Sequence, residues 1–285
     1  AVPWRLAAGD AAERLNALDD AVDQWQRALA AQPGPALALQ AHLRLARTRR
    51  RQGRLDDALA QVQAIQALAP RVDPALWHDA VTEAACSLIT CRRPQQALDM
   101  LDALPTAPDA HRGAWAQLRR AQTLAELGQP AAAQAVARPL RAGDALAGRE
   151  RAELLDTLVM LAWQAGQLPE ALDLLAESSR LAAQLGDEIG QARIRYRRAT
   201  LCLELGDLDG AEQAVQSALE PCRRLGQTAN LLALLQLLCS VHQRRGDWAR
   251  VVATVHDARQ PPHGPPEGLL HYVLRTALAE ALHAL

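Results

Sequence analysis

One turn recurs seven times along this 285-residue chain and constrains its fold more than any other feature. In each copy a residue, most often glycine, is followed five positions later by a small residue. The copies run from Asn16 to Ala21, Gly53 to Ala58, Arg92 to Ala97, Gly128 to Ala133, Gly166 to Ala171, Gly206 to Ala211 and Gly246 to Val251. Successive copies begin 36 to 40 residues apart. A nearly fixed period of this length indicates a repeat architecture.

The residues of each turn suit the junction between two helices. Glycine or asparagine provides the left-handed conformation that ends one helix, and the acidic or proline residues beyond it favour the start of the next. The small residue allows the two helices to approach closely. Alanine and leucine dominate the chain, phenylalanine is absent and aromatic residues total 3%, which favours helices. Each repeat is therefore predicted to be a helical hairpin covered by its neighbours.

We predict an all-α, right-handed superhelical solenoid of about seven hairpins plus a C-terminal helix. The first helices are expected near 4–15, 36–52, 74–91, 111–127, 148–165, 188–205 and 228–245. The second helices are expected near 18–31, 55–68, 94–104, 130–141, 168–185, 208–225 and 248–258. The chain is read as a single domain, 1–285, with repeats at 2–35, 36–73, 74–110, 111–147, 148–187, 188–227 and 228–263 and a terminal helix at 267–285. The terminal helix is either a cap or half of a truncated eighth repeat.

The small-residue and proline positions of 16–33 and 53–70 resemble the tetratricopeptide repeat (TPR) pattern, and Gly9 falls on its first-helix glycine. The repeats here exceed the usual 34 residues, and leucine often replaces the large aromatic residues of the pattern. These longer, leucine-rich repeats are similar to the TPR sensor arms of bacterial STAND signalling ATPases and MalT-like transcriptional regulators. That resemblance implies a piece of a larger protein with a regulatory role.

Composition excludes several classes of function. The chain contains no lysine, which excludes a P-loop, a Schiff-base lysine and a protein-kinase site. Five cysteines without a CxxC pair predict reduced thiols and a cytoplasmic location. The chain has no signal pattern and no stretch long enough to span a membrane.

A search for catalytic and metal-binding patterns finds none. The eight histidines are scattered over different repeats, and we expect them to be surface or half-buried residues. The HExxH, zinc-finger and GxSxG patterns are absent. We therefore expect no enzymatic activity, no metal and no cofactor.

Two arginine clusters stand out, at 44–54 and 193–198. Arginines near the end of a helix can simply complement its dipole, but the second cluster lies in mid-helix. With a net charge of -1 and few aromatic residues beside the arginines, direct nucleic-acid binding is not expected.

The resemblance also implies a binding surface, because the first helices of a TPR array line a concave groove. The predicted groove residues are Arg47, Arg50, Glu83, Trp115, Arg119, Asp156, Trp163, Arg193, Tyr196, Arg197 and Gln236. Arginine forks bind carboxylates and phosphates, and aromatic rings give rigid contact area. Arg193 and Arg197 are the pair expected to hold an anionic group, while Trp115 and Trp163 can equally be packing residues.

We therefore predict a non-catalytic module that binds a protein or peptide segment, or a small anionic effector, in the groove. It is expected to be the sensor or regulatory arm of a bacterial signalling ATPase or transcriptional regulator; the alternative is a free-standing adaptor that scaffolds protein assembly. The sequence leaves the ligand, the flanking domains and the oligomeric state open.

Overall fold

The computed structural model describes all residues except 1, 69–70, 225, 227, 259–268 and 285. The chain divides into two compact units, an N-terminal unit (1–157) and a C-terminal unit (158–285), with the division inside one helix. Each unit is described by itself. The expected single domain of 285 residues stays a prediction, and the expected boundaries at 263 and 267 lie outside the described residues.

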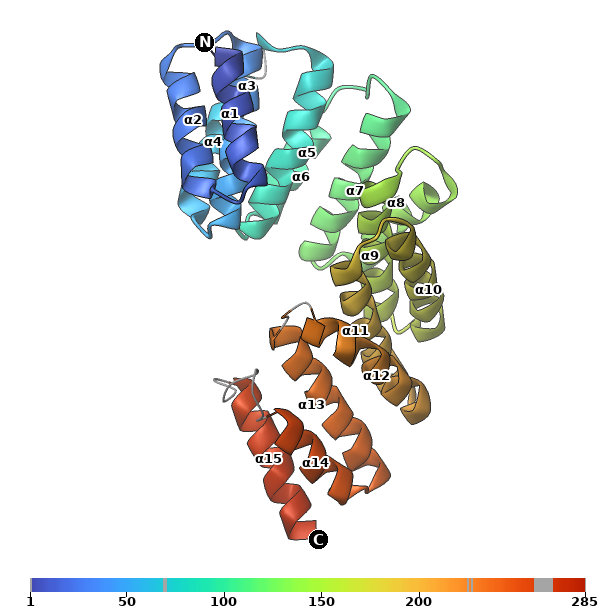
Figure 1. Ribbon diagram of the computed structural model, residues 1–285. Coiled ribbons are helices and arrows are strands. Elements are labelled where there is room, and N and C mark those ends of the chain that lie inside the picture. The colour runs from blue at the N-terminus through green and yellow to red at the C-terminus, as the bar shows by residue number, and fades with distance from the viewer. Residues whose placement is uncertain (1, 69–70, 225, 227, 259–268, 285) are drawn as a thin grey trace. The chain divides into compact units, whose positions relative to one another are not determined.

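Every secondary-structure element among the described residues is a helix (Figure 1). The helices of the N-terminal unit are α1 (Val2–Arg14), α2 (Leu18–Ala30), α3 (Pro35–Arg51), α4 (Leu55–Leu68), α5 (Pro74–Thr90), α6 (Pro94–Asp102), α7 (Ala110–Glu126), α8 (Pro130–Ala142) and the first part of α9 (Gly148–Gln164). The C-terminal unit contains the rest of α9, α10 (Leu168–Gln184), α11 (Glu188–Leu205), α12 (Leu208–Arg224), α13 (Thr228–Arg245), α14 (Trp248–Ala258) and α15 (Leu269–Ala284). The predicted succession of helical hairpins is confirmed, with ends within about two residues of those expected.

The recurring turn has the predicted backbone conformation. Each of its seven opening residues has a positive φ, between 58° and 79°. Asn16 and Arg92 adopt this conformation although neither is glycine. The register of the repeats read from the sequence is therefore correct.

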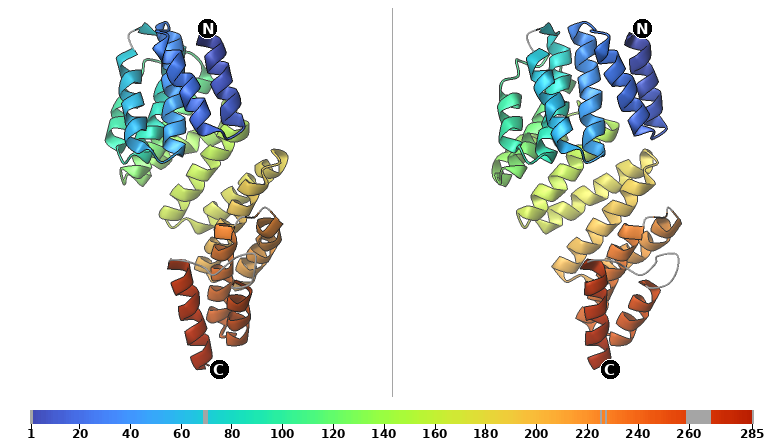
Figure 2. Two further views of the ribbon diagram at one scale, coloured as in Figure 1. Left: turned by 60° about the vertical axis from the view of Figure 1, so that its left-hand side comes forward. Right: turned by 90° about the vertical axis from the view of Figure 1, so that its left-hand side faces the viewer.

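The residue that closes each turn lies at the crossing of two helices. All seven of these residues, six alanines and Val251, are at most 1% exposed. In the N-terminal unit, contacts join α1 to α3, α3 to α5 and α5 to α7, so first helices lie side by side (Figure 2). In the C-terminal unit α11 contacts α13, and α15 packs against both α13 and α14.

Gly9 shows how tight such crossings are. The fully buried ring of Trp25, on α2, lies directly against it, and Trp25 Nε1 donates a hydrogen bond of 3.3 Å to the Leu6 carbonyl. The glycine expected from the TPR pattern is therefore a packing position.

Two histidines are more deeply buried than the sequence analysis predicts. His78 and His242 are 2% and 3% exposed, so the expectation of surface or half-buried histidines is wrong for these two. His78 Nε2 donates to the Pro105 carbonyl at 2.9 Å, which satisfies one of its ring nitrogens in the core. All five cysteines are free, and Cys86 and Cys91 are only half-buried.

None of the described helices combines the length and the apolar character needed to cross a lipid bilayer.

Candidate functional site

A polar cavity of about 910 Å³ lies within the N-terminal unit, on the side formed by its first helices. Five helices contribute to it: α1, α3, α5, α7 and α9. We refer to it as the first-helix cavity, and its lining residues are Glu13, Arg47, Arg50, Arg51, Glu83, Cys86, Thr90, Trp115, Arg119, Arg149, Glu150 and Glu153. Because one helix of each successive hairpin contributes, the repeat itself creates this surface.

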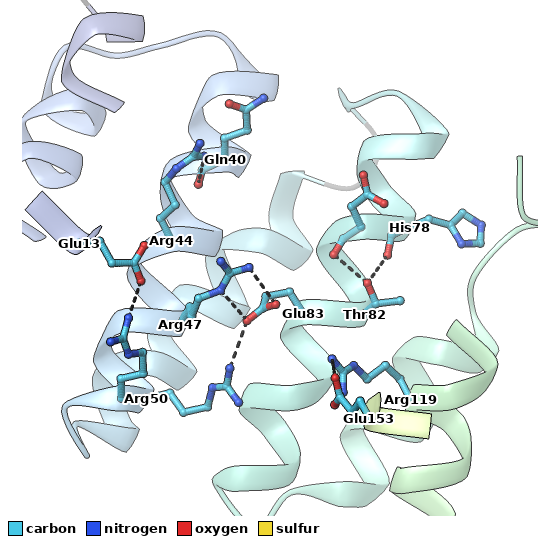
Figure 3. A network of polar contacts seen from close by, with 12 residues as sticks. Glu13, Gln40, Arg44, Arg47, Arg50, His78, Thr82, Glu83, Arg119 and Glu153 are labelled. Carbon is cyan, nitrogen blue, oxygen red and sulfur yellow. Dashed lines mark hydrogen bonds and ion pairs between the residues drawn. The ribbon is translucent and has the colours of Figure 1, made fainter. Parts of the chain in front are cut away.

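Glu83 on α5 lines the cavity and lies against Arg47 and Arg50 of α3 (Figure 3). Its side chain is 18% exposed and accepts hydrogen bonds from Arg47 Nε and Nη2, at 3.2 and 3.1 Å, and from Arg50 Nη2 at 3.2 Å. Burial alone would raise the pKa of Glu83, but the hydrogen bonds and charges of the arginines outweigh it and hold that pKa below its ordinary value. Glu83 is therefore an ionised carboxylate bound by two guanidinium groups from α3.

A second charged group lies between α7 and α9. Arg119 is 6% exposed at its side chain and pairs with Glu153, and its guanidinium carbon lies 4.1 Å from the centre of the Trp115 ring. Gln122 supports Glu153 through a hydrogen bond of 3.3 Å. The Nε atoms of Arg119 and Arg50 are both buried without a partner. Two guanidinium groups of the cavity thus retain an unsatisfied donor.

The open side of the cavity carries further charges. Arg51 pairs with Glu13 at 2.9 Å, and Glu150 lies 2.7 Å from His111 Nε2. Arg149 is exposed, and among the described contacts it makes no ion pair. With five arginines and four glutamates, the lining has a small excess of positive charge.

Cys86 also lines the cavity, but its environment makes it a poor nucleophile. Burial raises the pKa of its thiol to about 11, so it stays protonated at neutral pH. No cluster of histidine, cysteine and carboxylate side chains that could hold a metal is found in the described part of the chain. The cavity therefore offers hydrogen bonds, charge and aromatic surface.

The chain resembles known proteins in its fold and not in its sequence. No protein-family model matches the chain, and no curated protein is similar to it in sequence. A STAND protein with a tetratricopeptide repeat sensor from Pyrococcus horikoshii superposes with a TM-score of 0.73 at 12% identity, covering 94% of this chain and 42% of that protein. The chain has the tetratricopeptide-repeat fold.

Two further TPR-like structures agree. A thermophilic TPR protein of Thermus thermophilus has a TM-score of 0.52 at 25% identity, over 71% of this chain and all of that one. A Rap protein complexed with competence and sporulation factor has a TM-score of 0.60 at 14% identity, over 99% of this chain and 86% of that one. The expected likeness to a STAND TPR arm is thus found at the level of the fold.

Five of the residues predicted from the TPR groove pattern meet in the first-helix cavity: Arg47, Arg50, Glu83, Trp115 and Arg119. They come from α3, α5 and α7. Their convergence follows from the register of the repeats, since residues at equivalent positions of first helices face the same side.

The other predicted residues lie outside this cavity. Asp156 is on α9 in the N-terminal unit, and Trp163 in the C-terminal unit donates from Nε1 to Glu204 at 2.8 Å. On α11, Arg193 is exposed and Tyr196 packs against the core. The last two are Arg197 and Gln236, both half-buried in the C-terminal unit. A binding role for these six residues stays a prediction.

The cavity also includes residues that the sequence analysis did not select. Glu13 and Arg149 lie on first helices, which line the groove in the TPR resemblance, so that resemblance could have identified them. Arg51 belongs to the arginine cluster at 44–54 but was not assigned to the groove, and Glu150 was given no binding role. Their contribution depends on how far each long side chain reaches.

Proposed function

We propose that this chain is a binding module that holds a segment of a partner protein or a peptide in the first-helix cavity. The observation that carries the proposal is the cavity itself: about 910 Å³, lined from five helices by paired guanidinium and carboxylate groups and one half-buried tryptophan. Its volume lies within the range of ligand sites, about 300 to 1,000 Å³. A module of this kind needs no catalytic group.

The accessible donors indicate the chemistry of the ligand. The side chains of Arg47 and Arg51 are 49% and 46% exposed, and Arg149 is exposed at the rim. These guanidinium groups can donate to the carboxylates and backbone carbonyls of a peptide. Trp115 adds rigid contact area at a small entropic cost. A segment with at least one acidic residue fits this arrangement best.

A small anionic effector is the second candidate for the same cavity. The excess of one positive charge and the unsatisfied Nε atoms of Arg50 and Arg119 favour it. A peptide fits the lining better, because its N–H and carbonyl groups can use the carboxylates and guanidinium groups that five helices contribute.

Selection of peptides tests the proposal directly. A phage-displayed random 12-residue library is panned on the intact chain, and the affinity of selected peptides is measured by fluorescence polarisation. Arg149→Glu and Trp115→Ala are expected to weaken binding at least tenfold. The matched control is Arg71→Glu, which reverses an exposed charge outside the cavity.

Two results would contradict the proposal. One is equal affinity for the parent, Arg149→Glu and Arg71→Glu proteins; the other is the absence of any selected binder. Circular dichroism of each variant separates lost binding from lost folding. Arg149→Glu is the decisive variant because its exposed side chain supports no other described residue.

The role of the module in the cell is a finer proposal. We infer that it is the sensor or regulatory arm of a larger signalling ATPase or transcriptional regulator, with a free-standing adaptor as the alternative. The fold likeness to the STAND sensor over 94% of this chain supports the first reading. An ATPase module encoded ahead of this segment in its gene is the expected finding. A complete, short reading frame would favour the adaptor.

A further inference from the structure

A second cavity, in the C-terminal unit, carries a different charge pattern. It has a volume of about 280 Å³ and lies over α11 between α10 and α12. Two members of the 193–198 arginine cluster line it, Arg195 and Arg198. Arg193 and Arg197 fall on another face of α11, because an α-helix turns about 100° per residue. The proposed peptide site does not use this cavity.

The lining of this cavity contains two guanidinium groups and no carboxylate. Arg195 is half-buried and donates from Nη2 to the Gln191 side chain at 3.2 Å, and Arg198 is exposed beside the Cys202 thiol. In the part of the chain that the structure describes, neither arginine forms an ion pair. By contrast, Arg223 in the same unit lies 2.6 Å from a carboxylate. The two lining arginines therefore keep free donors, although the Cys202 thiol beside Arg198 also lies near the Asp207 carboxylate.

Neutral polar groups complete the set of donors. Ser179 comes from α10, and Ser217 and Gln213 come from α12. Ser217 Oγ donates its one proton to the Ala214 carbonyl at 2.8 Å, so it offers the cavity lone pairs, while Ser179 and Gln213 supply the neutral donors. Donors thus reach the cavity from three helices and from different directions. A tetrahedral oxyanion can use such a set, whereas a carboxylate has only two oxygens in one plane.

The size of the cavity limits the rest of the ligand. A volume of 280 Å³ is slightly below the usual lower end for ligand sites, about 300 Å³. The apolar side chains of Leu175 and Ile194 also line it. An oxyanion joined to a small organic group matches both the volume and the lining.

We propose that this cavity binds the phosphate of a small phosphate monoester, with Arg195 and Arg198 as its cationic ligands. Ser179 and Gln213 donate to the remaining phosphate oxygens, and Ser217 Oγ accepts a hydrogen bond from a hydroxyl of the organic group. The site is separate from the first-helix cavity, so the two proposals stand or fall independently.

Isothermal titration calorimetry with glycerol 3-phosphate, in a low-salt buffer without phosphate, tests the proposal on the intact chain. The parent protein is expected to bind it, and Arg198→Gln is expected to weaken binding at least tenfold. Arg193→Gln is the matched control, since it removes one exposed arginine from the same helix but not from the cavity lining. Its affinity is expected to stay within twofold of the parent.

A steric variant tests the place of binding without changing charge. Ala176 is exposed and lines the cavity, so Ala176→Leu fills the space with little effect on folding. It is expected to weaken binding at least tenfold, as Arg198→Gln does. Arg71→Glu, which lies outside both cavities, is expected to leave binding unchanged.

Each contrary result overturns the proposal. If titration of the parent protein with glycerol 3-phosphate gives no binding heat, the cavity is not a site for it. If the parent, Arg198→Gln and Ala176→Leu proteins bind glycerol 3-phosphate with equal affinity, the ligand binds outside this cavity. If only Arg193→Gln weakens binding, the ligand binds on the other face of α11. Glycerate binding as tightly as glycerol 3-phosphate refutes the phosphate assignment, and so does equal binding of glycerol.

Discussion

Replacing Gly9 by alanine sets two opposite effects against each other. An alanine Cβ would lie 2.2 Å from Trp25 Nε1 and 2.6 Å from Trp25 Cδ1, whereas non-bonded carbon atoms rest about 3.5 to 4.0 Å apart. Relieving this overlap in a packed core costs about 1 to 3 kcal/mol. Alanine in place of glycine inside a helix contributes about 1 kcal/mol in the other direction.

The ring shift also affects a hydrogen bond. Trp25 Nε1 donates to the Leu6 carbonyl at 3.3 Å, and losing that bond costs about 1 kcal/mol. The helix gain and the hydrogen-bond loss therefore roughly cancel. The net expectation for Gly9→Ala is a loss of about 1 to 3 kcal/mol in the free energy of unfolding.

Urea denaturation followed by circular dichroism measures the change, and hydrogen exchange locates it in α1 and α2. Gly113→Ala is the control, because its Cβ meets only the Ala107 Cβ, at 3.3 Å, and its effect is expected to stay within about 1 kcal/mol. In a Trp25→Leu background the ring is gone, and Gly9→Ala should become neutral or stabilising. A Gly9→Ala protein as stable as the parent, or equally destabilised in both backgrounds, would refute the reasoning.

Three further predictions concern individual side chains. Glu83→Gln removes the carboxylate that Arg47 and Arg50 share and is expected to cost about 2 to 3 kcal/mol at pH 7. The pKa of Glu83 is lowered by folding, so this contribution is present above the unfolded pKa and is lost as the pH falls through the folded one. The difference in unfolding free energy between parent and variant should therefore begin to shrink as the pH falls below about 4. Arg92→Gly places glycine at a φ of 58° and is expected to raise stability by about 0.5 to 1 kcal/mol, and a lower urea midpoint would contradict this. With a pKa raised to about 11, Cys86 should react with iodoacetamide more slowly in the native chain than in urea at pH 7.5, and equal rates by peptide mass spectrometry would show that it is not protected.

The fold could be predicted from the sequence because its signal is local and repeated. A glycine that needs a positive φ and an alanine at a helix crossing are each decided within a few residues, and seven copies in register reinforce one another. Arg92 shows the limit of this reasoning: it occupies the glycine position without glycine's freedom, and only the register of the other copies identifies it.

The site was only partly predictable, because its residues meet across repeats. The position of Glu83 on its helix indicates the face it occupies, and so does that of Arg119. Which arginine reaches which carboxylate depends on side-chain reach and on the spacing of neighbouring helices, as for Arg51 with Glu13 on α1. Among the described residues neither Arg195 nor Arg198 forms an ion pair, which the arginine cluster alone does not reveal.

The sharing of Glu83 by two arginines affects how a ligand can enter and leave. If an incoming carboxylate takes Arg47, the more exposed of the two, Glu83 keeps its hydrogen bond to Arg50. At no stage of such an exchange is a buried charge left without a counter-charge. The step that usually makes replacement of a buried ion pair slow is thereby avoided. A ligand of this cavity should consequently bind and dissociate rapidly.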